Sequence, residues 1–130
     1  MRCLLDTHVL VWWSIDEKSR LNAAWDLIAD PSNEIFVSAI SLWEIAIKTQ
    51  LGRMGGDVAR LRSTIAPAGF ADLPFLADDA AEIAKLPPIH RDPFDRALIA
   101  QARCQGLRLL TADEKLSAYG ESVLPIDSLG

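Results

Sequence analysis

The sequence predicts an α/β domain in which a parallel five-stranded sheet lies between two layers of helices. Short apolar runs alternate with longer segments of helical periodicity, a pattern typical of βαβ units. At 130 residues, the chain can bury one core without disulfides or a structural metal ion. It has no internal repeat and no linker long enough to separate two domains, so we expect residues 1–130 to form a single domain.

Five short segments have the apolar composition of buried strands. The first directly precedes an aspartate, and the second combines β-branched with aromatic residues. Because the carboxyl ends of parallel strands meet at one edge of a sheet, we expect a functional site beyond that edge. The expected strands are residues 2–5, 34–37, 70–73, 107–110 and 123–126.

The helical segments between these strands begin and end at residues that favour helix boundaries. Ser19 is a suitable N-cap for the second helix, which Asp30-Pro31 ends. Gly52 ends the third helix, and Pro93 suits the first turn of the sixth. The expected helices are residues 7–13, 19–29, 39–51, 57–65, 77–86, 93–105 and 113–119.

The charge balance is acidic, with 13 basic and 18 acidic residues and a formal net charge of −5. This balance argues against non-specific binding to nucleic acid, which requires a basic surface. The distribution is uneven, however, because residues 48–62 are mainly basic and residues 72–82 are acidic. Two solvated helix faces explain this pattern equally well. The basic residues that could guide a nucleic-acid backbone are Lys48, Arg53, Arg60 and Arg62.

The sequence also indicates a cytoplasmic location. No apolar run reaches the roughly 20 residues that cross a bilayer, and the first residues lack the features of a signal peptide. Cys3 and Cys104 each lie among apolar residues with no second cysteine nearby. We therefore expect both to be reduced and to fill the core.

Four acidic residues occupy positions where a site is expected. Asp6 directly follows the first strand, and Asp113 follows the fourth. Glu44 and Asp95 lie in the first two turns of the third and sixth helices. Each also has a structural explanation, as an N-cap, a member of a capping box or an ion-pair partner. Their shared location at one edge of the sheet favours a joint function.

Helical periodicity indicates which way two of these acids point. On a helical wheel, Glu44 lies beside Leu51, at the edge of an apolar stripe. The stripe consists of Ile40, Trp43, Ile47 and Leu51. Asp95 points between Leu98 and Ile99, on the apolar side of its helix. Because burial of an unpaired carboxylate is costly, Asp95 must be neutral, paired or bound to a metal ion.

Gathered carboxylates repel one another and raise one another's pKa unless a cation compensates them. Mg²⁺ prefers a few carboxylate oxygens completed by waters. A bound ion can activate a water and neutralise charge on a phosphodiester, and two ions about 3.5–4 Å apart do both together. The sequence therefore predicts a Mg²⁺-dependent nuclease whose catalytic and metal-binding residues are Asp6, Glu44, Asp95 and Asp113.

No other catalytic chemistry is indicated. His8 and His90 have no cysteine or histidine partners at metal-ligand spacing, and we interpret His90 as a loop residue. No serine has the context of a nucleophile elbow, and there is no glycine-rich phosphate-binding loop. The tryptophans recur at helical spacing and are expected in the core; they are Trp12, Trp13, Trp25 and Trp43.

Four motifs carry the candidate acids. They are LLDTH at 4–8, SLWEIAIK at 41–48, HRDPFDR at 90–96 and LLTAD at 109–113. In this order and spacing they closely resemble the motifs of PIN-domain proteins, and more narrowly those of VapC-type toxins of bacterial type II toxin–antitoxin systems. The resemblance covers essentially the whole chain.

The resemblance implies a three-layer α/β/α fold and an endoribonuclease activity that depends on Mg²⁺, with Mn²⁺ as a substitute. By motif match, the family's four acids fall on Asp6, Glu44, Asp95 and Asp113. Thr7 and Thr111 fall on positions that often support the metal ligands, and Asp92 matches a feature without an assigned role. The resemblance also implies an RNA substrate, a homodimer and a small DNA-binding antitoxin of the VapB type.

Two alternative functions remain open. The chain could be a PIN-fold binding or regulatory module without catalysis, although all four acids are present. It could also be a phosphoacceptor receiver domain, which has a similar size and strand number. A receiver needs an acidic pair after the first strand and a lysine after the last, whereas Asp6 stands alone and Asp127 follows the last strand.

Overall fold

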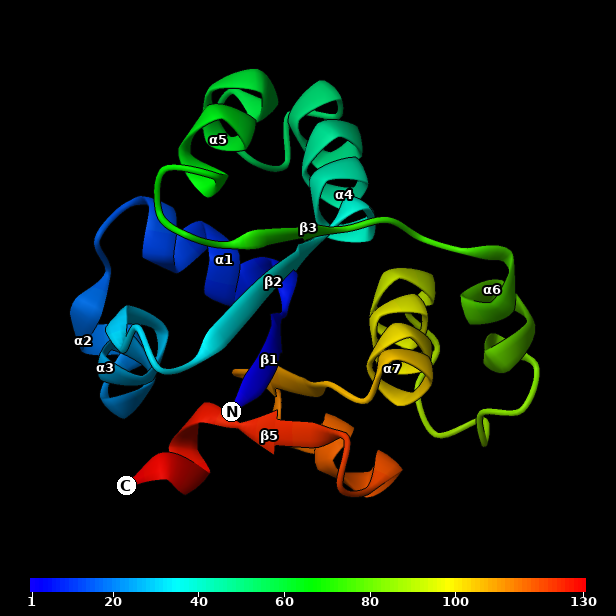
Figure 1. Ribbon diagram of the computed structural model, residues 1–130. Helices are drawn as coiled ribbons and strands as arrows, with labels where there is room; N and C mark the ends of the chain where they lie inside the picture. Colours follow the sequence, from blue (N-terminus) through cyan, green and yellow to red (C-terminus); the bar gives the residue numbers. More distant parts are fainter.

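The computed structural model describes all 130 residues and contains one five-stranded sheet. The strands are β1 (Arg2–Leu5), β2 (Glu34–Ser38), β3 (Ala71–Leu73), β4 (Arg108–Thr111) and β5 (Val123–Pro125). All neighbours are parallel, and the order β3-β2-β1-β4-β5 places β1 at the centre (Figure 1). The predicted parallel five-stranded sheet is confirmed. A receiver domain differs, because its third strand lies beside its first.

Helices cover both faces of the sheet and complete the three layers. The α-helices are α1 (Thr7–Ser14), α2 (Lys18–Leu21), α3 (Ala23–Ala29), α4 (Ala39–Gln50), α5 (Val58–Ile65), α6 (Ala77–Ile83) and α7 (Pro93–Gln105). The 3₁₀ helices are η1 (Glu114–Tyr119) and η2 (Ile126–Leu129). In Figure 1, α6 and α7 pack together on one side of the sheet, and α1, α2 and α3 lie on the other. No helix is both long and apolar enough to cross a membrane.

The central strand builds a core on each face of the sheet. Successive side chains of a strand point to opposite faces. Leu4 therefore packs in one core with Leu98 and Ile99 of α7, whereas Cys3 and Leu5 belong to the core formed with α1, α3 and α4. All five side chains are fully buried. This explains why the first strand is apolar and buried from Cys3 to Leu5, as expected for a strand covered on both sides.

A buried polar bridge ties the two helices that carry Glu44 and Asp95. The Ser38 hydroxyl caps α4 by accepting from the Ile40 N–H (3.0 Å), and it donates to Oε1 of Gln101 in α7. The Gln101 amide in turn donates to the Pro74 carbonyl (3.2 Å). Ser38 and Gln101 are both fully buried. The bridge therefore fixes the start of α4 against the middle of α7.

The predicted helix over 19–29 is wrong in one respect, because the chain forms two helices, α2 and α3, that meet at Asn22. The φ of Asn22 is +52°, in the left-handed region. A residue in this conformation cannot continue a right-handed helix, and asparagine adopts it more readily than most residues. The last predicted helix is a 3₁₀ helix, and η2 was not expected from the sequence.

The buried face of α4 differs from the predicted apolar stripe. Trp43 and Leu51 are 57% and 61% exposed, whereas Glu44 is only 3% exposed. Trp43 instead packs edge-on against Phe94 of α7, with ring centroids 5.1 Å apart. The expectation that Trp43 lies in the core is therefore wrong. The other three tryptophans are half-buried and pack against the core, as predicted.

The two cysteines have different environments. Cys3 is buried in the core, as predicted, but Cys104 is exposed. Cys104 follows the continuous buried run of α7, which ends at Ala102, and its thiol contacts the Asp78 carbonyl of α6 (3.7 Å). The prediction that Cys104 fills the core is therefore wrong.

We predict that Leu4→Ala destabilises the protein by about 2–5 kcal/mol, because it removes a fully buried side chain from the central strand and leaves a cavity. Chemical denaturation measures this change in the free energy of unfolding. Leu51→Ala, at a site 61% exposed, is the matched control and should change it by less than about 0.5 kcal/mol. Equal effects of the two substitutions would contradict the central role of β1.

Candidate metal centre

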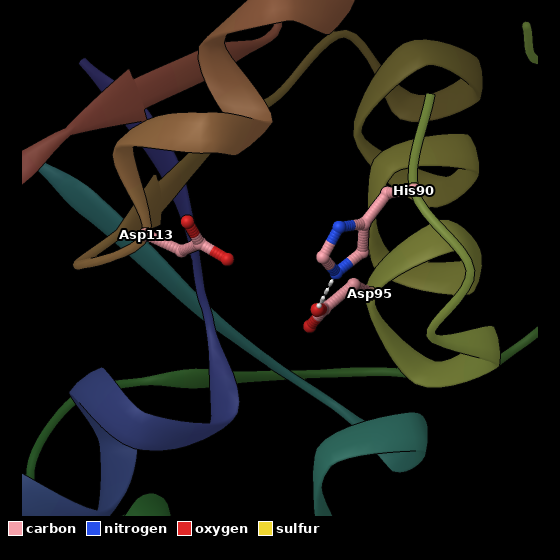
Figure 2. Close-up of side chains that lie close together, drawn as sticks. All are labelled: His90, Asp95 and Asp113. Atoms are coloured by element: carbon pink, nitrogen blue, oxygen red, sulfur yellow. Dashed lines mark hydrogen bonds and ion pairs between the residues drawn. The ribbon is translucent and has the colours of Figure 1, made fainter. Parts of the chain in front are cut away.

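An acidic pocket lies at the carboxyl edge of the sheet, beyond the ends of β1 and β4. Its volume is about 410 Å³. Figure 2 shows Asp113, which follows β4, and Asp95 of α7 pointing toward the same space. All four acids that the sequence proposed as metal ligands line the pocket. The lining residues are Asp6, His8, Trp12, Glu44, Lys48, Asp92, Asp95, Ala112 and Asp113.

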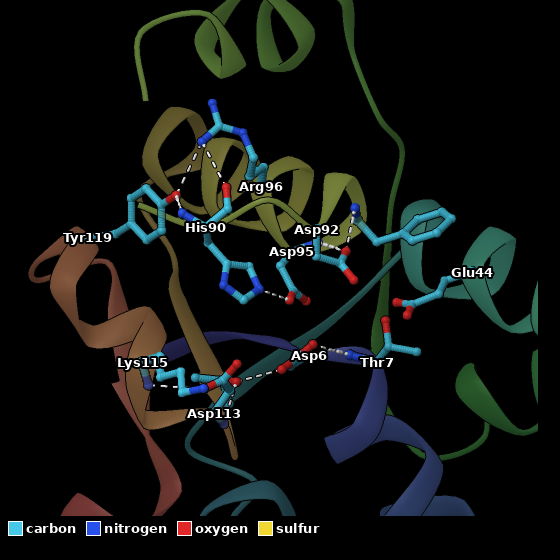
Figure 3. A network of polar contacts seen from close by, with 12 residues as sticks. Asp6, Thr7, Glu44, His90, Asp92, Asp95, Arg96, Asp113, Lys115 and Tyr119 are labelled. Atoms are coloured by element: carbon cyan, nitrogen blue, oxygen red, sulfur yellow. Dashed lines mark hydrogen bonds and ion pairs between the residues drawn. The ribbon is translucent and has the colours of Figure 1, made fainter. Parts of the chain in front are cut away.

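Asp6 is buried and held by hydrogen bonds from two elements (Figure 3). Its Oδ1 accepts from the Thr7 N–H (2.7 Å), so that Asp6 caps α1, and its Oδ2 accepts from the Thr111 hydroxyl at the end of β4 (2.5 Å). Burial raises the pKa of Asp6, and these two hydrogen bonds partly oppose the rise. Asp6 is thus a helix cap and a pocket-facing carboxylate at once.

Glu44 combines an ion pair with an unsatisfied oxygen. Its Oε2 accepts from the Lys48 ammonium (2.5 Å), the pair allowed by their i, i+4 spacing, and this bond raises the pKa of Lys48. Its Oε1 is buried without any hydrogen-bond partner. A buried carboxylate oxygen without a partner is costly, so a cation or a donor at this point stabilises the protein.

Asp95 is positioned by Asp92 and contacts His90. Asp92 caps α7 by accepting from the N–H groups of Phe94 (2.8 Å) and Asp95 (3.0 Å). The Asp95 side chain is half-buried, and its Oδ2 lies 2.8 Å from Nε2 of His90. Burial, followed by the negative charges of Asp6 and Asp92, raises the pKa of Asp95 to about 7, although His90 lowers it.

Asp113 enters the pocket from the turn after β4. Its Oδ1 accepts from the Lys115 N–H (3.0 Å) and so caps η1. Its own N–H donates to the Thr111 hydroxyl (3.1 Å), the same hydroxyl that donates to Asp6. Thr111 therefore links the two aspartates that follow the two neighbouring strands.

Two histidines that the sequence did not indicate as site residues lie at the pocket: His8 lines it, and His90 lies beside it against Asp95. His90 lies in a loop, as predicted, but its ring also forms a cluster with Asp95 and Asp113 whose ligand atoms lie within 4.8 Å of one another. The only available signal was its position just before the cap of α7, where a side chain can reach back over the first helical turn. The contacts that hold it come from distant residues, which the sequence pattern does not disclose.

The basic residues proposed to guide RNA are only partly near the pocket. Lys48 lines it. Arg60 instead lines a separate pocket of about 290 Å³ between α1, α4 and α5, and Arg62 pairs with Asp72 (2.8 Å). Arg53 lies exposed beyond the end of α4. The structure therefore brings one of these four residues to the carboxylates.

The residues of the pocket fit a divalent cation. Five carboxylates face it against one lysine, and one buried oxygen of Glu44 has no partner. Carboxylate oxygens are the ligands that hard divalent ions prefer. The arrangement thus has the chemical character of a metal centre for hydrolysis or phosphoryl transfer.

The three-layer fold and its acidic pocket define a class of α/β proteins with a candidate metal centre at the carboxyl edge of a parallel sheet. The chain belongs to the PIN domain family, whose model matches residues 3–122. It is 31% identical over 122 residues to ribonuclease VapC22 of Mycobacterium tuberculosis, an alignment that covers 89% of this chain and 90% of that relative. The resemblance drawn from the four motifs is therefore confirmed.

Solved structures share the fold. A chain of VapBC2 from Rickettsia felis, bound to a DNA fragment from its promoter, matches with a TM-score of 0.71 at 16% identity, covering 96% of this chain and 97% of that one. VapBC-5 of Mycobacterium tuberculosis, a member of the VapBC family of toxin–antitoxin systems, matches with a TM-score of 0.59 at 22% identity, covering 95% and 96%. At these identities, the likeness concerns the fold.

The raised pKa of Asp95 predicts how the stability of the metal-free protein depends on pH. Because the pKa is higher in the folded state than in the unfolded chain, the contribution of Asp95 to stability is largest at low pH and is lost as the pH rises from about 4 to about 7. Asp95→Asn, which mimics the neutral acid, should therefore raise the free energy of unfolding by about 1–2 kcal/mol near pH 8, a value discounted for solvent screening.

Chemical denaturation in the presence of a chelator, at about pH 4 and about pH 8, measures this difference. Near pH 4 the wild-type protein and the Asp95→Asn variant should be equally stable. An Asp95→Asn protein that is less stable than the wild type near pH 8 would show that the ionised carboxylate is well compensated without a metal ion.

Proposed function

We propose that the chain is a Mg²⁺-dependent endoribonuclease and the toxin of a type II toxin–antitoxin system. The observation that carries this proposal is the gathering of five carboxylates and one lysine around a pocket in which a buried Glu44 oxygen has no partner. Membership of the PIN domain family, and the 31% identical relative named ribonuclease VapC22, support hydrolysis of RNA. A non-catalytic module is less well supported, because the fold alone does not need so many repelling charges.

In this proposal, Asp6 and Asp95 are the principal ligands, and Glu44 and Asp113 complete the shell directly or through water. When bound, a divalent cation lowers the pKa of a coordinated water and neutralises charge on the phosphodiester. The protein fixes the ligand oxygens beforehand: Thr111 and the Thr7 N–H hold the Asp6 carboxylate, while Asp92 holds the backbone of Asp95. Asp113 and Glu44 would orient the attacking water.

The donors support Mg²⁺ as the ion in this proposal. The four acids offer oxygen atoms alone, and such a set suits Mg²⁺, which keeps several waters in its shell. Mn²⁺ also accepts carboxylate and water ligands and can substitute. The supporting residues Thr7, Thr111 and Asp92 act through the acids rather than on the ion itself, since their side chains are engaged in hydrogen bonds.

The proposed partners are an antitoxin and a second copy of the chain. Solved structures of the same fold come from VapBC complexes, one of which is bound to promoter DNA. By analogy, a small DNA-binding antitoxin of the VapB type would cover the pocket and place a basic side chain against its carboxylates. A toxin of this kind acts in the cytoplasm on cellular RNA, as a homodimer.

We predict that Asp6→Asn lowers the rate of RNA cleavage at least about 100-fold, because it removes a charged ligand oxygen from the pocket. Cleavage of end-labelled RNA with Mg²⁺ provides the measurement, and a chelator should stop the wild-type reaction. Asp16→Asn is the control, since Asp16 is exposed outside the pocket and asparagine tolerates its φ of +57°. Full activity of the Asp6→Asn protein, or cleavage by the wild type in chelator, would refute the proposal.

Lys48 and Arg53 were both proposed to guide RNA, but only Lys48 lines the pocket. Lys48→Gln should therefore weaken RNA binding about 5–10-fold and reduce the slope of log affinity against log salt by about one, because one phosphate contact is lost. Binding is measured in chelator, so that RNA stays intact. Arg53→Gln should change neither quantity. A larger effect of Arg53→Gln would move the RNA path away from the carboxylates.

A further inference from the structure

A nitrogen donor, His90, lies beside two carboxylates of the acidic pocket. His90, Asp95 and Asp113 come from the loop before α7, from α7 itself and from the turn after β4 (Figure 2). The ring Nε2 of His90 lies 2.8 Å from Oδ2 of Asp95, and one ligand atom from each residue lies within 4.8 Å of the other two. Glu44 lines the same pocket as Asp95 and Asp113, and its buried Oε1 has no hydrogen-bond partner, which independently points to a ligand there.

His90 is held in place although it lies in a loop. Its backbone N–H donates to the hydroxyl of the buried Tyr119 (2.9 Å), and the Arg96 guanidinium donates to the same hydroxyl (3.2 Å). The Arg96 guanidinium also donates to the carbonyls of Pro87 (3.1 Å), Ile83 (3.2 Å) and His90 (3.4 Å). Figure 3 shows Tyr119 and Arg96 on the side of His90 away from the acids. The ring is thereby presented to Asp95 in advance of any ligand.

The geometry of the cluster suits adjacent ligands of one ion. In an octahedral shell with bonds of about 2.1 Å, neighbouring ligand atoms are about 3.0 Å apart. The Nε2–Oδ2 separation of 2.8 Å is close to this value. Imidazole is a poor ligand for Mg²⁺ but a good one for transition-metal ions. Its presence therefore changes which metal ion a carboxylate site prefers.

We propose that His90, with Asp95 and Asp113, forms a cation subsite that binds Mn²⁺ and related transition-metal ions through the imidazole nitrogen in preference to Mg²⁺. The proposal extends the proposed nuclease function, because the subsite shares Asp95 and Asp113 with the four acids of the metal centre. It assigns His90 to metal selectivity, whereas a histidine that only orients Asp95 by a hydrogen bond would leave the choice of ion unchanged.

The test is electron spin echo spectroscopy of Mn²⁺ bound to protein with ¹⁵N-labelled histidine, together with Mn²⁺ and Mg²⁺ titrations. The chain has two histidines and both line or adjoin the pocket, so His8→Gln is a matched control for His90→Gln. We expect a directly bound ¹⁵N in the wild type and in His8→Gln, and its loss in His90→Gln. The last variant should bind Mn²⁺ at least about tenfold more weakly, with Mg²⁺ affinity changed less than about threefold.

Bound Mn²⁺ without nitrogen coupling in the wild type would overturn the proposal, and this result does not depend on how any variant folds. Equal Mn²⁺ affinity of His90→Gln and wild type would overturn it as well. If the wild type cleaves RNA with Mg²⁺ while its bound Mn²⁺ shows no nitrogen ligand, the subsite fails and the nuclease function stands. If nitrogen coupling is present but no RNA is cleaved, the subsite is supported and the nuclease function fails.

Discussion

The site depends on one electrostatic constraint, the presence of five carboxylates and a single lysine in one pocket. Burial and mutual repulsion raise the pKa of Asp6 and Asp95, so the metal-free fold holds this charge at a cost. Hydrogen bonds from Thr111, the Thr7 N–H and His90 offset part of that cost. What remains uncompensated is available to a cation, and in this way metal affinity and folding stability are coupled.

The topology explains why the acids meet. Because β1 and β4 are parallel neighbours, Asp6 and Asp113 emerge side by side from their carboxyl ends. The Ser38–Gln101 bridge then fixes α4 against α7, so that Glu44 and Asp95 approach from the two helices. Two of these acids also cap helices. Asp6 and Asp113 can therefore serve as helix caps and as metal ligands at once. The helix N–H groups that donate to their side chains also orient their carboxylates.

The sequence predicted the strands and the edge where the acids gather, because both follow from local periodicity and from the geometry of parallel sheets. The predictions from sequence were wrong where contacts between distant elements determine which side chain is buried. The apolar stripe of α4 suggested a buried Trp43, yet the helix turns Glu44 inward and leaves the indole on Phe94. The break between α2 and α3 requires a left-handed backbone conformation at Asn22, which the amino-acid sequence does not indicate. His90 depends on Tyr119, which is 29 residues away in the chain.

The net charge of −5 does not favour binding of a polyanion, so the proposed RNA substrate needs a local source of positive charge at the pocket. The basic residues of the 48–62 stretch do not form one surface around the acids, since Arg62 pairs with Asp72 and Arg60 lines another pocket. In the proposed function, attraction of RNA by the whole surface would be weak, and a bound cation and Lys48 would supply the positive charge where a phosphate meets the carboxylates. In the proposed function, binding of RNA and binding of the ion would therefore reinforce each other, because the ion offsets the repulsion between the carboxylates and the phosphodiester.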